Sequence, residues 1–207
     1  MSPKTHLVHF PRMSFSRAKS ELDEIVRDYR RTADVGVLLS RLAVVGREHA
    51  VEDLVTALKP YMDLHEVAGP VYEVIVEREP DNARALVALA NAYWLTGRGP
   101  EVVSGLSERA RKADPSNRGA WHLWALSESS PRERANRWNQ VVERFPQDDL
   151  ARANLADNAA SLAGAENDPV ALKLALANYE KLLSTAARPE QRAALEKALT
   201  SLKNFRG

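Results

Sequence analysis

Histidine side chains are the first place to look for metal or acid–base chemistry, and their spacing does not support it. The pair His6-x-x-His9 has a spacing that two metal ligands can have, but no carboxylate stands near it. His65 is followed by Glu66 without a second histidine at helical spacing, so the zinc-protease motif is absent. Since metal sites normally need three or four converging ligands, we expect no metal and no cofactor.

Nucleophilic and phosphate-binding motifs are missing too. The chain has no cysteine, which removes disulfides, thiol nucleophiles and thiolate metal sites. It has no Gly-x-Ser-x-Gly motif and no glycine-rich loop followed by Lys-Ser or Lys-Thr. No predicted strand precedes Gly97-Arg98-Gly99, so we interpret these residues as a turn between helices. We therefore expect no catalytic residues and a protein that is not an enzyme.

Charged residues are nearly balanced, with 29 Lys and Arg against 28 Asp and Glu. Most carboxylates have a basic residue three or four positions away, as on a solvated helix face. Basic clusters occur at residues 27–31, 109–112 and 132–137, interleaved with acidic residues that would weaken binding to phosphates. Nucleic acid is for this reason a weaker alternative as a partner.

Helices must position whatever surface the protein uses, because apolar residues recur at helical spacing along most of the chain. Leu22, Ile25, Val26 and Tyr29 mark one such face. The breaks between these stretches carry Pro, Gly, Asp, Asn and Ser, which end one helix and cap the next. No alternating run flanked by hairpin signals predicts a strand. The sequence predicts an all-α protein of about eleven helices.

The N-terminal part is expected to differ from the middle of the chain. Residues 1–13 contain Pro3 and Pro11, and we expect a flexible segment there. The segment lacks the apolar run of a signal peptide, and nowhere do about 18 apolar residues follow one another as in a membrane-spanning helix. We expect no membrane anchor and a cytoplasmic location. Residues 14–48 are expected to form a flanking helix pair, with Asp34 as the cap of its second helix.

A repeat is visible in three prolines, Pro80, Pro115 and Pro146, which are separated by 35 and 31 residues. Each precedes a similar helix in which a small residue stands four positions after a large or long one. A second helix follows each of them and carries two marker residues four positions apart. Ala68-x-x-x-Tyr72 shows the same spacing upstream. The matching stretches are Leu86-x-x-Leu89-Ala90-x-x-Tyr93, Trp121-x-x-Trp124-Ala125-x-x-Glu128 and Arg152-x-x-Leu155-Ala156-x-x-Ala159, with second-helix pairs Val102/Leu106, Arg134/Trp138 and Ala175/Tyr179.

This pattern resembles the tetratricopeptide repeat (TPR), whose period is roughly 34 residues. The resemblance implies a right-handed superhelical stack of antiparallel helix pairs, a TPR-like α-solenoid. Its repeats would span residues 49–187, with a C-terminal capping helix in residues 188–207. Trp121, Trp124 and Trp138 then belong to the core. Glu128, Arg134 and Arg152 depart from the family pattern, so the repeats are degenerate.

The same resemblance implies where a ligand would bind, since the first helix of each unit lines the concave side in this family. The groove-facing candidates are Val87, Asn91, Trp94, His122, Leu126 and Asp157. Trp94 follows Tyr93 directly, so the two rings cannot share a helix face. If Tyr93 holds the core position, Trp94 points either into the groove or against a neighbouring repeat, and the sequence leaves both open.

We interpret the sequence as that of a protein–protein interaction module: a scaffold, adaptor or chaperone-like factor that holds a segment of another protein. Three alternatives remain: a regulatory repeat protein that contacts nucleic acid, an accessory subunit of an enzyme complex, and a protein that binds a second copy of itself. An apolar surface around Trp94 favours a protein partner or self-association, whereas a continuous basic stripe favours nucleic acid.

Overall fold

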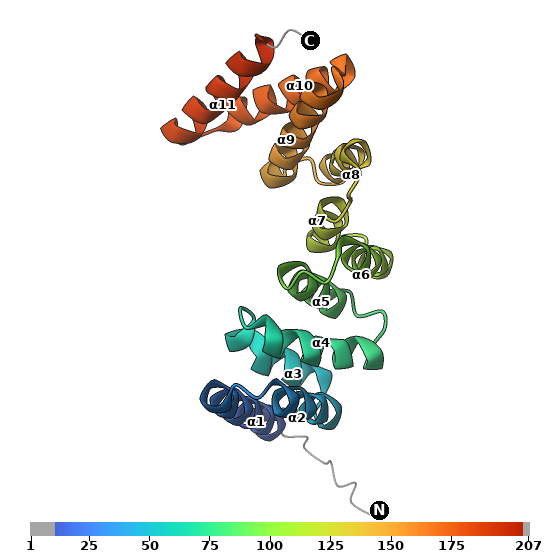
Figure 1. Ribbon diagram of the computed structural model, residues 1–207, viewed down its shortest axis with the longest axis vertical. Coiled ribbons are helices and arrows are strands. Elements are labelled where there is room, and N and C mark those ends of the chain that lie inside the picture. Colours follow the sequence, from blue (N-terminus) through green and yellow to red (C-terminus); the bar gives the residue numbers. More distant parts are fainter. Residues whose placement is uncertain (1–10, 205–207) are drawn as a thin grey trace, which may run out of the picture. The chain divides into compact units, whose positions relative to one another are not determined.

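The computed structural model describes residues 11–204, with side chains from Phe15 onward, and every regular element in this range is helical. The chain divides into two compact units, residues 1–98 and 99–207, and each is described by itself. Unit 1 holds helices α1 to α5 and one short 3₁₀ turn, η1 (Figure 1). Their bounds are α1 Pro11–Thr32, α2 Val35–Glu48, α3 Val51–Leu58, η1 Lys59–Tyr61, α4 His65–Arg78 and α5 Ala83–Leu95.

Unit 2 holds the remaining six helices, each of which contacts the next one along the chain. They are α6 Pro100–Ala113, α7 Arg118–Leu126, α8 Pro131–Arg144, α9 Asp149–Glu166, α10 Pro169–Thr185 and α11 Pro189–Lys203. Residues 11–204 therefore contain eleven α-helices and no strand, as the sequence predicted. None of the described helices combines the length and the apolar character that crossing a bilayer requires.

The helix starts follow the capping chemistry expected from the sequence. Six N-cap side chains accept a hydrogen bond from a backbone N–H of the first turn, which satisfies one of the donors that every helix start leaves open. Proline occupies the start of α6, α8, α10 and α11, where its missing N–H costs nothing. The capping residues are Asp34, Asn82, Asn117, Ser130, Asp148 and Asp168.

Helix α1 begins at Pro11 and so includes the last three residues of the segment 1–13 that we expected to be flexible. Proline opposes a helix interior but not a first turn, because the first N–H groups have no partner within the helix. Residues 1–10, with the His6 and His9 pair, lie outside the described residues.

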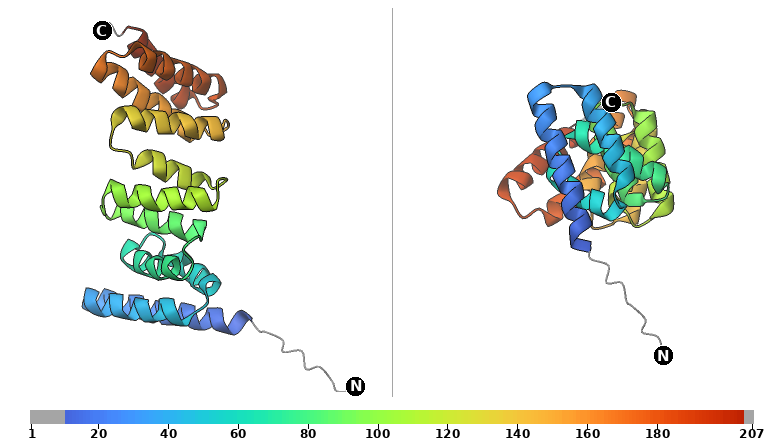
Figure 2. Two further views of the ribbon diagram at one scale, coloured as in Figure 1. Left: turned by 90° about the vertical axis from the view of Figure 1, so that its right-hand side faces the viewer. Right: turned by 90° about the horizontal axis from the view of Figure 1, so that it is seen from below.

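In unit 1, α1 and α2 form an antiparallel hairpin that is seen clearly in the right-hand view of Figure 2. Helix α1 also contacts α3, α2 contacts α4, and α4 contacts α5. Leu22, Leu42, Leu54 and Ile75 are fully buried between these helices. Helices α2 and α4 approach closely at Gly46, where an added Cβ would lie 3.0 Å from the Val74 Cβ.

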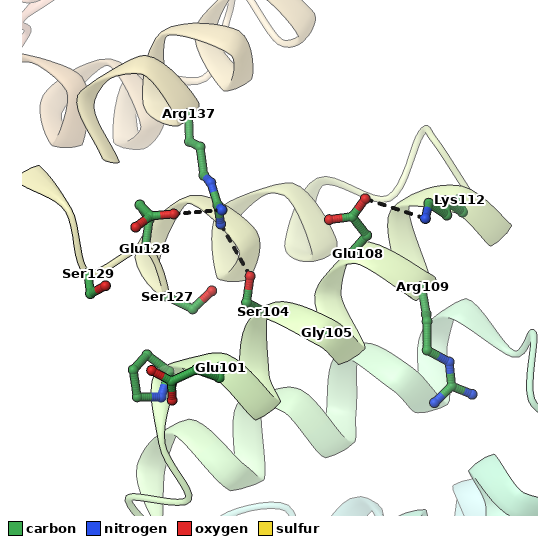
Figure 3. A pocket seen from close by; sticks show the side chains of 11 residues that line it. Glu101, Ser104, Gly105, Glu108, Arg109, Lys112, Ser127, Glu128, Ser129 and Arg137 are labelled. Carbon is green, nitrogen blue, oxygen red and sulfur yellow. Dashed lines mark hydrogen bonds and ion pairs between the residues drawn. The ribbon is translucent and has the colours of Figure 1, made fainter. Parts of the chain in front are cut away.

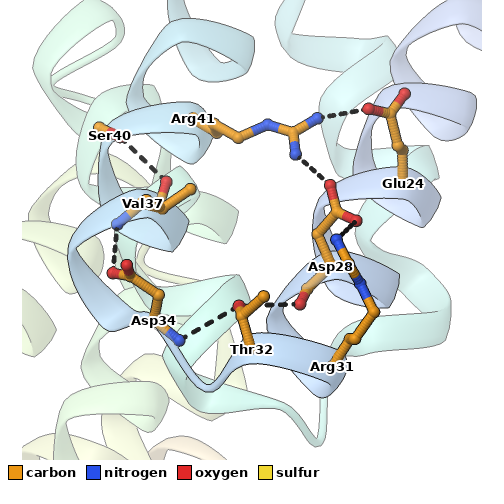
Figure 4. A network of polar contacts seen from close by, with 8 residues as sticks. All are labelled: Glu24, Asp28, Arg31, Thr32, Asp34, Val37, Ser40 and Arg41. Atoms are coloured by element: carbon orange, nitrogen blue, oxygen red, sulfur yellow. Dashed lines mark hydrogen bonds and ion pairs between the residues drawn. The ribbon is translucent and has the colours of Figure 1, made fainter.

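A polar network on the surface of unit 1 ties α1 to α2 (Figure 4). The Arg41 guanidinium donates to Glu24 at 2.8 Å and to Asp28 at 2.7 Å. Across the connecting turn, the Asp34 N–H donates to the Thr32 hydroxyl, and the Asp34 side chain accepts from the Val37 N–H. The hairpin is therefore fixed at its turn by caps and along its length by ion pairs.

The core of unit 2 is built around two tryptophans. Trp124 and Trp138 are buried together with Val141 and Leu155, which confirms their assignment to the core. Trp121 is half-buried and packs edge-on against Trp124, with ring centroids 5.8 Å apart. The Arg111 guanidinium of α6 lies 3.9 Å from the centroid of Trp121 and 3.6 Å from that of Trp124. The Arg111 guanidinium is thus held beside the aromatic core by cation–π stacking.

Candidate protein-binding surfaces

The first candidate surface is one face of α5, in unit 1. Val87, Asn91 and Trp94 recur at helical spacing, and the opposite side of α5 is buried. Val87 is half-buried, Asn91 is exposed, and Trp94 is 38% exposed. The Trp94 ring is therefore partly accessible rather than enclosed. The buried side consists of Ala85, Leu86, Leu89, Ala90 and Ala92.

Tyr93 explains why its neighbour Trp94 faces outward. The Tyr93 hydroxyl donates to Glu73 of α4 at 2.6 Å. The Arg98 guanidinium lies over the Tyr93 ring, 5.3 Å from its centroid. Burial and the bond to Glu73 together raise the pKa of Tyr93 to about 12, so it stays a hydrogen-bond donor. Adjacent helix positions point about 100° apart, so anchoring Tyr93 on α4 directs Trp94 away from α4.

Leu95 belongs to the same surface and was missed by the sequence reasoning. It lies four positions after Asn91 and is 56% exposed. Its spacing of four positions from Asn91 could have placed Leu95 on this surface, but a leucine at the end of a helix is more often a core residue. Val87, Asn91, Trp94 and Leu95 stand at the i, i+4, i+7 and i+8 positions of one helical stripe, with Trp94 and Leu95 at its two edges near the C-terminal end of α5; we call these four residues the α5 face.

The two candidates on α7 were expected to face a ligand, but both make contacts with other side chains of unit 2. The His122 Nε2 lies 2.7 Å from the Asp148 carboxylate, and its ring packs edge-on against Trp138. Leu126 is half-buried and packs against the core cluster around Trp124. Both side chains are therefore engaged within unit 2. Asp148 and Trp138 lie on other elements, and a local sequence pattern cannot place them beside α7.

Asp157 is exposed on α9 and lies at the edge of an apolar groove in unit 2. Its carboxylate accepts a hydrogen bond from the Tyr179 hydroxyl of α10 at 2.5 Å. The groove has a volume of about 480 Å³ and is formed by α9, α10 and α11; we call it the α9–α11 groove. Its lining residues are Asp149, Leu150, Ala153, Asp157, Tyr179, Leu182, Gln191, Ala194, Leu195 and Ala198.

A second cavity of unit 2, of about 540 Å³, is polar and lies beside α6 (Figure 3). Its charged groups neutralise one another: Arg137 pairs with Glu128 at 2.6 Å, and Lys112 pairs with Glu108 at 3.5 Å. Arg137 also donates to the Ser104 hydroxyl. Such a balanced lining has no net charge with which to select an ionic ligand. No group of three or more potential metal ligands occurs in the part of the chain that the structure describes.

The basic clusters seen in the sequence are partly engaged within the protein. Arg31 pairs with Asp28, and Arg132 pairs with Glu166 and with Asp168. Arg134 donates to Asn158 and to the Glu128 carbonyl. Together with the Arg111 stack and the Arg137 pair, these contacts engage part of each cluster with partners inside the protein.

Comparison with known proteins rests on structure, because no protein-family model matches the sequence and no curated protein matches it significantly. TTC0263, described as a thermophilic TPR protein of Thermus thermophilus, superposes with a TM-score of 0.53 at 16% identity, covering 91% of this chain and all of that one. The fold is TPR-like. Two structures of the protein MamA also match, with TM-scores of 0.56 and 0.51 at 17% and 18% identity. They cover 84% and 74% of this chain, and 100% and 94% of their own.

The TPR-like repeats appear in the structure at the helices that the sequence matched. The N-cap residues Asn82, Asn117 and Asp148 start α5, α7 and α9, the three predicted first helices. The small residues Ala90, Ala125 and Ala156 are completely buried in them. These alanines allow the close helix packing that the repeat pattern predicted.

Proposed function

We propose that the protein is a protein–protein interaction module that holds a segment of another protein against the exposed side of α5, one of its TPR-like first helices. The observation that carries the proposal is the α5 face, where Trp94 and Leu95 are exposed although the other side of α5 is buried. Tryptophan is among the residues that contribute most to binding when a partner covers them. Asn91 beside them supplies a side-chain amide that can bond a peptide backbone.

The charge distribution favours a protein partner over nucleic acid as the occupant of this surface. Phosphate binding requires several unpaired Lys or Arg side chains on one face, because its affinity comes from released counterions. On the α5 face the four residues are neutral. A polypeptide segment with apolar side chains is the occupant that such a surface suits.

Site-specific crosslinking tests the proposal. A photo-crosslinking amino acid at Asn91, which is exposed, is expected to capture a partner protein in extract of the source cells. The same amino acid at Glu77, exposed on α4, serves as the control and should not capture it. Adding Trp94→Ala to the Asn91 variant should abolish capture while leaving far-UV circular dichroism and the melting temperature nearly unchanged.

Two outcomes would contradict the proposal. Equal capture from Asn91 and Glu77 would show that crosslinking reports random encounters. A large drop in melting temperature for Trp94→Ala would show that the ring supports the fold instead of a partner.

A further inference from the structure

The α9–α11 groove is an apolar channel between helices that are consecutive in unit 2. It is lined by Leu150 and Ala153 of α9, by Leu182 of α10, and by Leu195 and Ala198 of α11. Its volume of about 480 Å³ falls in the range of roughly 300–1,000 Å³ typical of ligand sites. Leu150 is 63% exposed, so the groove presents an aliphatic side chain to solvent.

One face of α11 remains unpaired along this groove. Gln191, Ala194, Leu195 and Ala198 recur at the i, i+3, i+4 and i+7 positions of a single helix face, and all four line the groove. In the described part of α11, Leu199 is the one buried residue. A groove lined by three helices, with apolar side chains spaced along α11, is suited to receive a peptide segment through spaced apolar anchors.

The charge of the groove selects among such segments. Asp149 and Asp157 are the two charged side chains that line it, and both are carboxylates. The Tyr179 hydroxyl occupies one Oδ atom of Asp157, whereas a carboxylate can accept about four hydrogen bonds. Asp149 and Asp157 are both exposed, at two points along the wall that α9 contributes. An acidic partner would meet repulsion here, and a cationic one would gain charge-assisted hydrogen bonds.

We propose that the α9–α11 groove binds a peptide segment that carries leucine-like aliphatic side chains next to Lys or Arg. The proposal rests on the function proposed above, since it assumes a protein-binding module and names the chemistry of one partner segment. The aliphatic side chains fill the channel against Leu150, Leu182 and Leu195. The cations bond to Asp149 and Asp157, which fixes the direction of the segment.

A peptide library selected on the full-length protein tests this inference. Phage-displayed random peptides are panned on the immobilised chain, and the enriched sequences are remeasured as labelled peptides by fluorescence anisotropy. Enriched peptides should combine Leu, Ile or Met with Lys or Arg. Leu150→Asp should raise their Kd at least about tenfold, the effect of losing one well-buried anchor.

Matched variants separate groove binding from general effects. Val170→Asp places the same change on a 75% exposed aliphatic residue of unit 2 that does not line the groove, and it should leave the Kd unchanged. Asp149→Asn combined with Asp157→Asn should weaken binding several-fold and flatten its salt dependence. Circular dichroism of each variant checks that the helices are retained, which the exposure of Leu150 and Val170 favours.

The possible failures are distinct. Enrichment of acidic peptides, or equal effects of Leu150→Asp and Val170→Asp, would overturn the inference. So would sedimentation showing a dimer that Leu150→Asp dissociates, because the occupant would then be a second copy of the chain. Peptides that depend on Trp94 and not on Leu150 would overturn it while supporting the proposed function. Peptides that depend on neither residue would contradict both.

Discussion

At the scale of single residues, Arg152 shows how a polar side chain occupies an apolar repeat position. Trp121 stands four residues after the N-cap of α7, and its Nε1 donates to the Pro115 carbonyl, six residues earlier, at 3.0 Å. Arg152 has the same place in α9, and its Nη2 donates to the Pro146 carbonyl at 2.8 Å. Both are long side chains with an N–H at the tip, so the bond to the preceding loop survives the change of residue.

Arg192 extends this comparison to the last helix. It stands four residues after the N-cap of α11, and its guanidinium donates to the Ala186 carbonyl, six residues earlier, at 3.3 Å. Helix α11 was expected to be a capping helix. Its start shares this hydrogen bond with α7 and α9, but its N-cap residue, Arg188, makes no side-chain capping bond.

Arg152→Ala should destabilise the protein by about 1–3 kcal/mol, because it removes hydrogen bonds to Pro146 and to Asn178. Arg152→Met keeps the aliphatic stem without donors and should recover part of the loss. Lys173→Ala, on an exposed site of α10, should change stability by less than about 0.5 kcal/mol. Urea unfolding followed by circular dichroism gives the comparison. An Arg152→Ala variant as stable as Lys173→Ala would show that the loop bond contributes nothing.

Asp148, the N-cap of α9, makes the stability of the protein depend on pH. Burial alone would raise its pKa, but hydrogen bonds from the Ala151 N–H and from His122, with Arg118 nearby, outweigh burial and lower the pKa below its usual value. A carboxyl whose pKa is lowered by folding stabilises the protein above its ordinary pKa of about 3.9. This stability is lost as the pH falls through the lower pKa of the folded state.

Asp148→Asn should therefore cost about 1–2 kcal/mol at pH 7 and progressively less at a pH below about 3.9, where the unfolded chain takes up the proton first. Asparagine retains the capping oxygen for the Ala151 N–H, so the change isolates the negative charge. Urea unfolding of both proteins at about pH 7 and at about pH 3 measures the difference. A difference that is the same at both would assign the loss to packing instead of charge.

At the scale of elements, two glycines fix the turn that follows α5. Gly97 has φ of 71° and Gly99, the N-cap of α6, has φ of 97°, a region that side chains with a Cβ avoid. Gly105, inside α6, is helical and would meet nothing within 4 Å if it carried a Cβ. The same Gly→Ala change thus has opposite consequences at positions a few residues apart.

We expect Gly99→Ala to destabilise the protein by about 1–2 kcal/mol through backbone strain. Gly105→Ala should stabilise it by about 0.5–1 kcal/mol, because alanine loses less conformational entropy in a helix. Thermal unfolding of the two variants beside the parent measures the pair. Destabilisation by Gly105→Ala would show that α6 is not helical at that position.

Local chemistry explains which elements could be predicted from the sequence. Caps such as Asp34 and prolines such as Pro131 act within one turn, so the helix starts were predicted to within a few residues. Contacts across the chain escaped prediction. His122 appeared to face a ligand because Asp148, its partner, lies 26 residues away and approaches only after α8 and α9 have packed. The exposed side of Trp94 could be predicted because Tyr93, its neighbour, had a recognisable repeat position; its role in binding stays a prediction.

At the scale of the whole molecule, the chain divides at a point that the repeat pattern did not suggest. The boundary between residues 98 and 99 falls inside the expected repeat after Pro80, between its two helices. Repeats are held by contacts with their neighbours, so a repeat array can divide wherever few contacts cross. The positive φ angles of Gly97 and Gly99 mark the same place in the backbone.

The division predicts that residues 99–207 fold without the rest of the chain. The members of the core cluster around Trp124 and Trp138 all lie within this unit, as do those of a second cluster with Ala135 and Leu162. A fragment of residues 99–207 should therefore be helical by far-UV circular dichroism and should unfold cooperatively with urea. A fragment of residues 131–207 lacks Trp121, Trp124 and the Arg111 stack, and it should lose most of its cooperativity. A disordered 99–207 fragment would show that unit 2 depends on residues 1–98. Fragments that unfold alike would show that Trp121, Trp124 and the Arg111 stack do not hold unit 2 together.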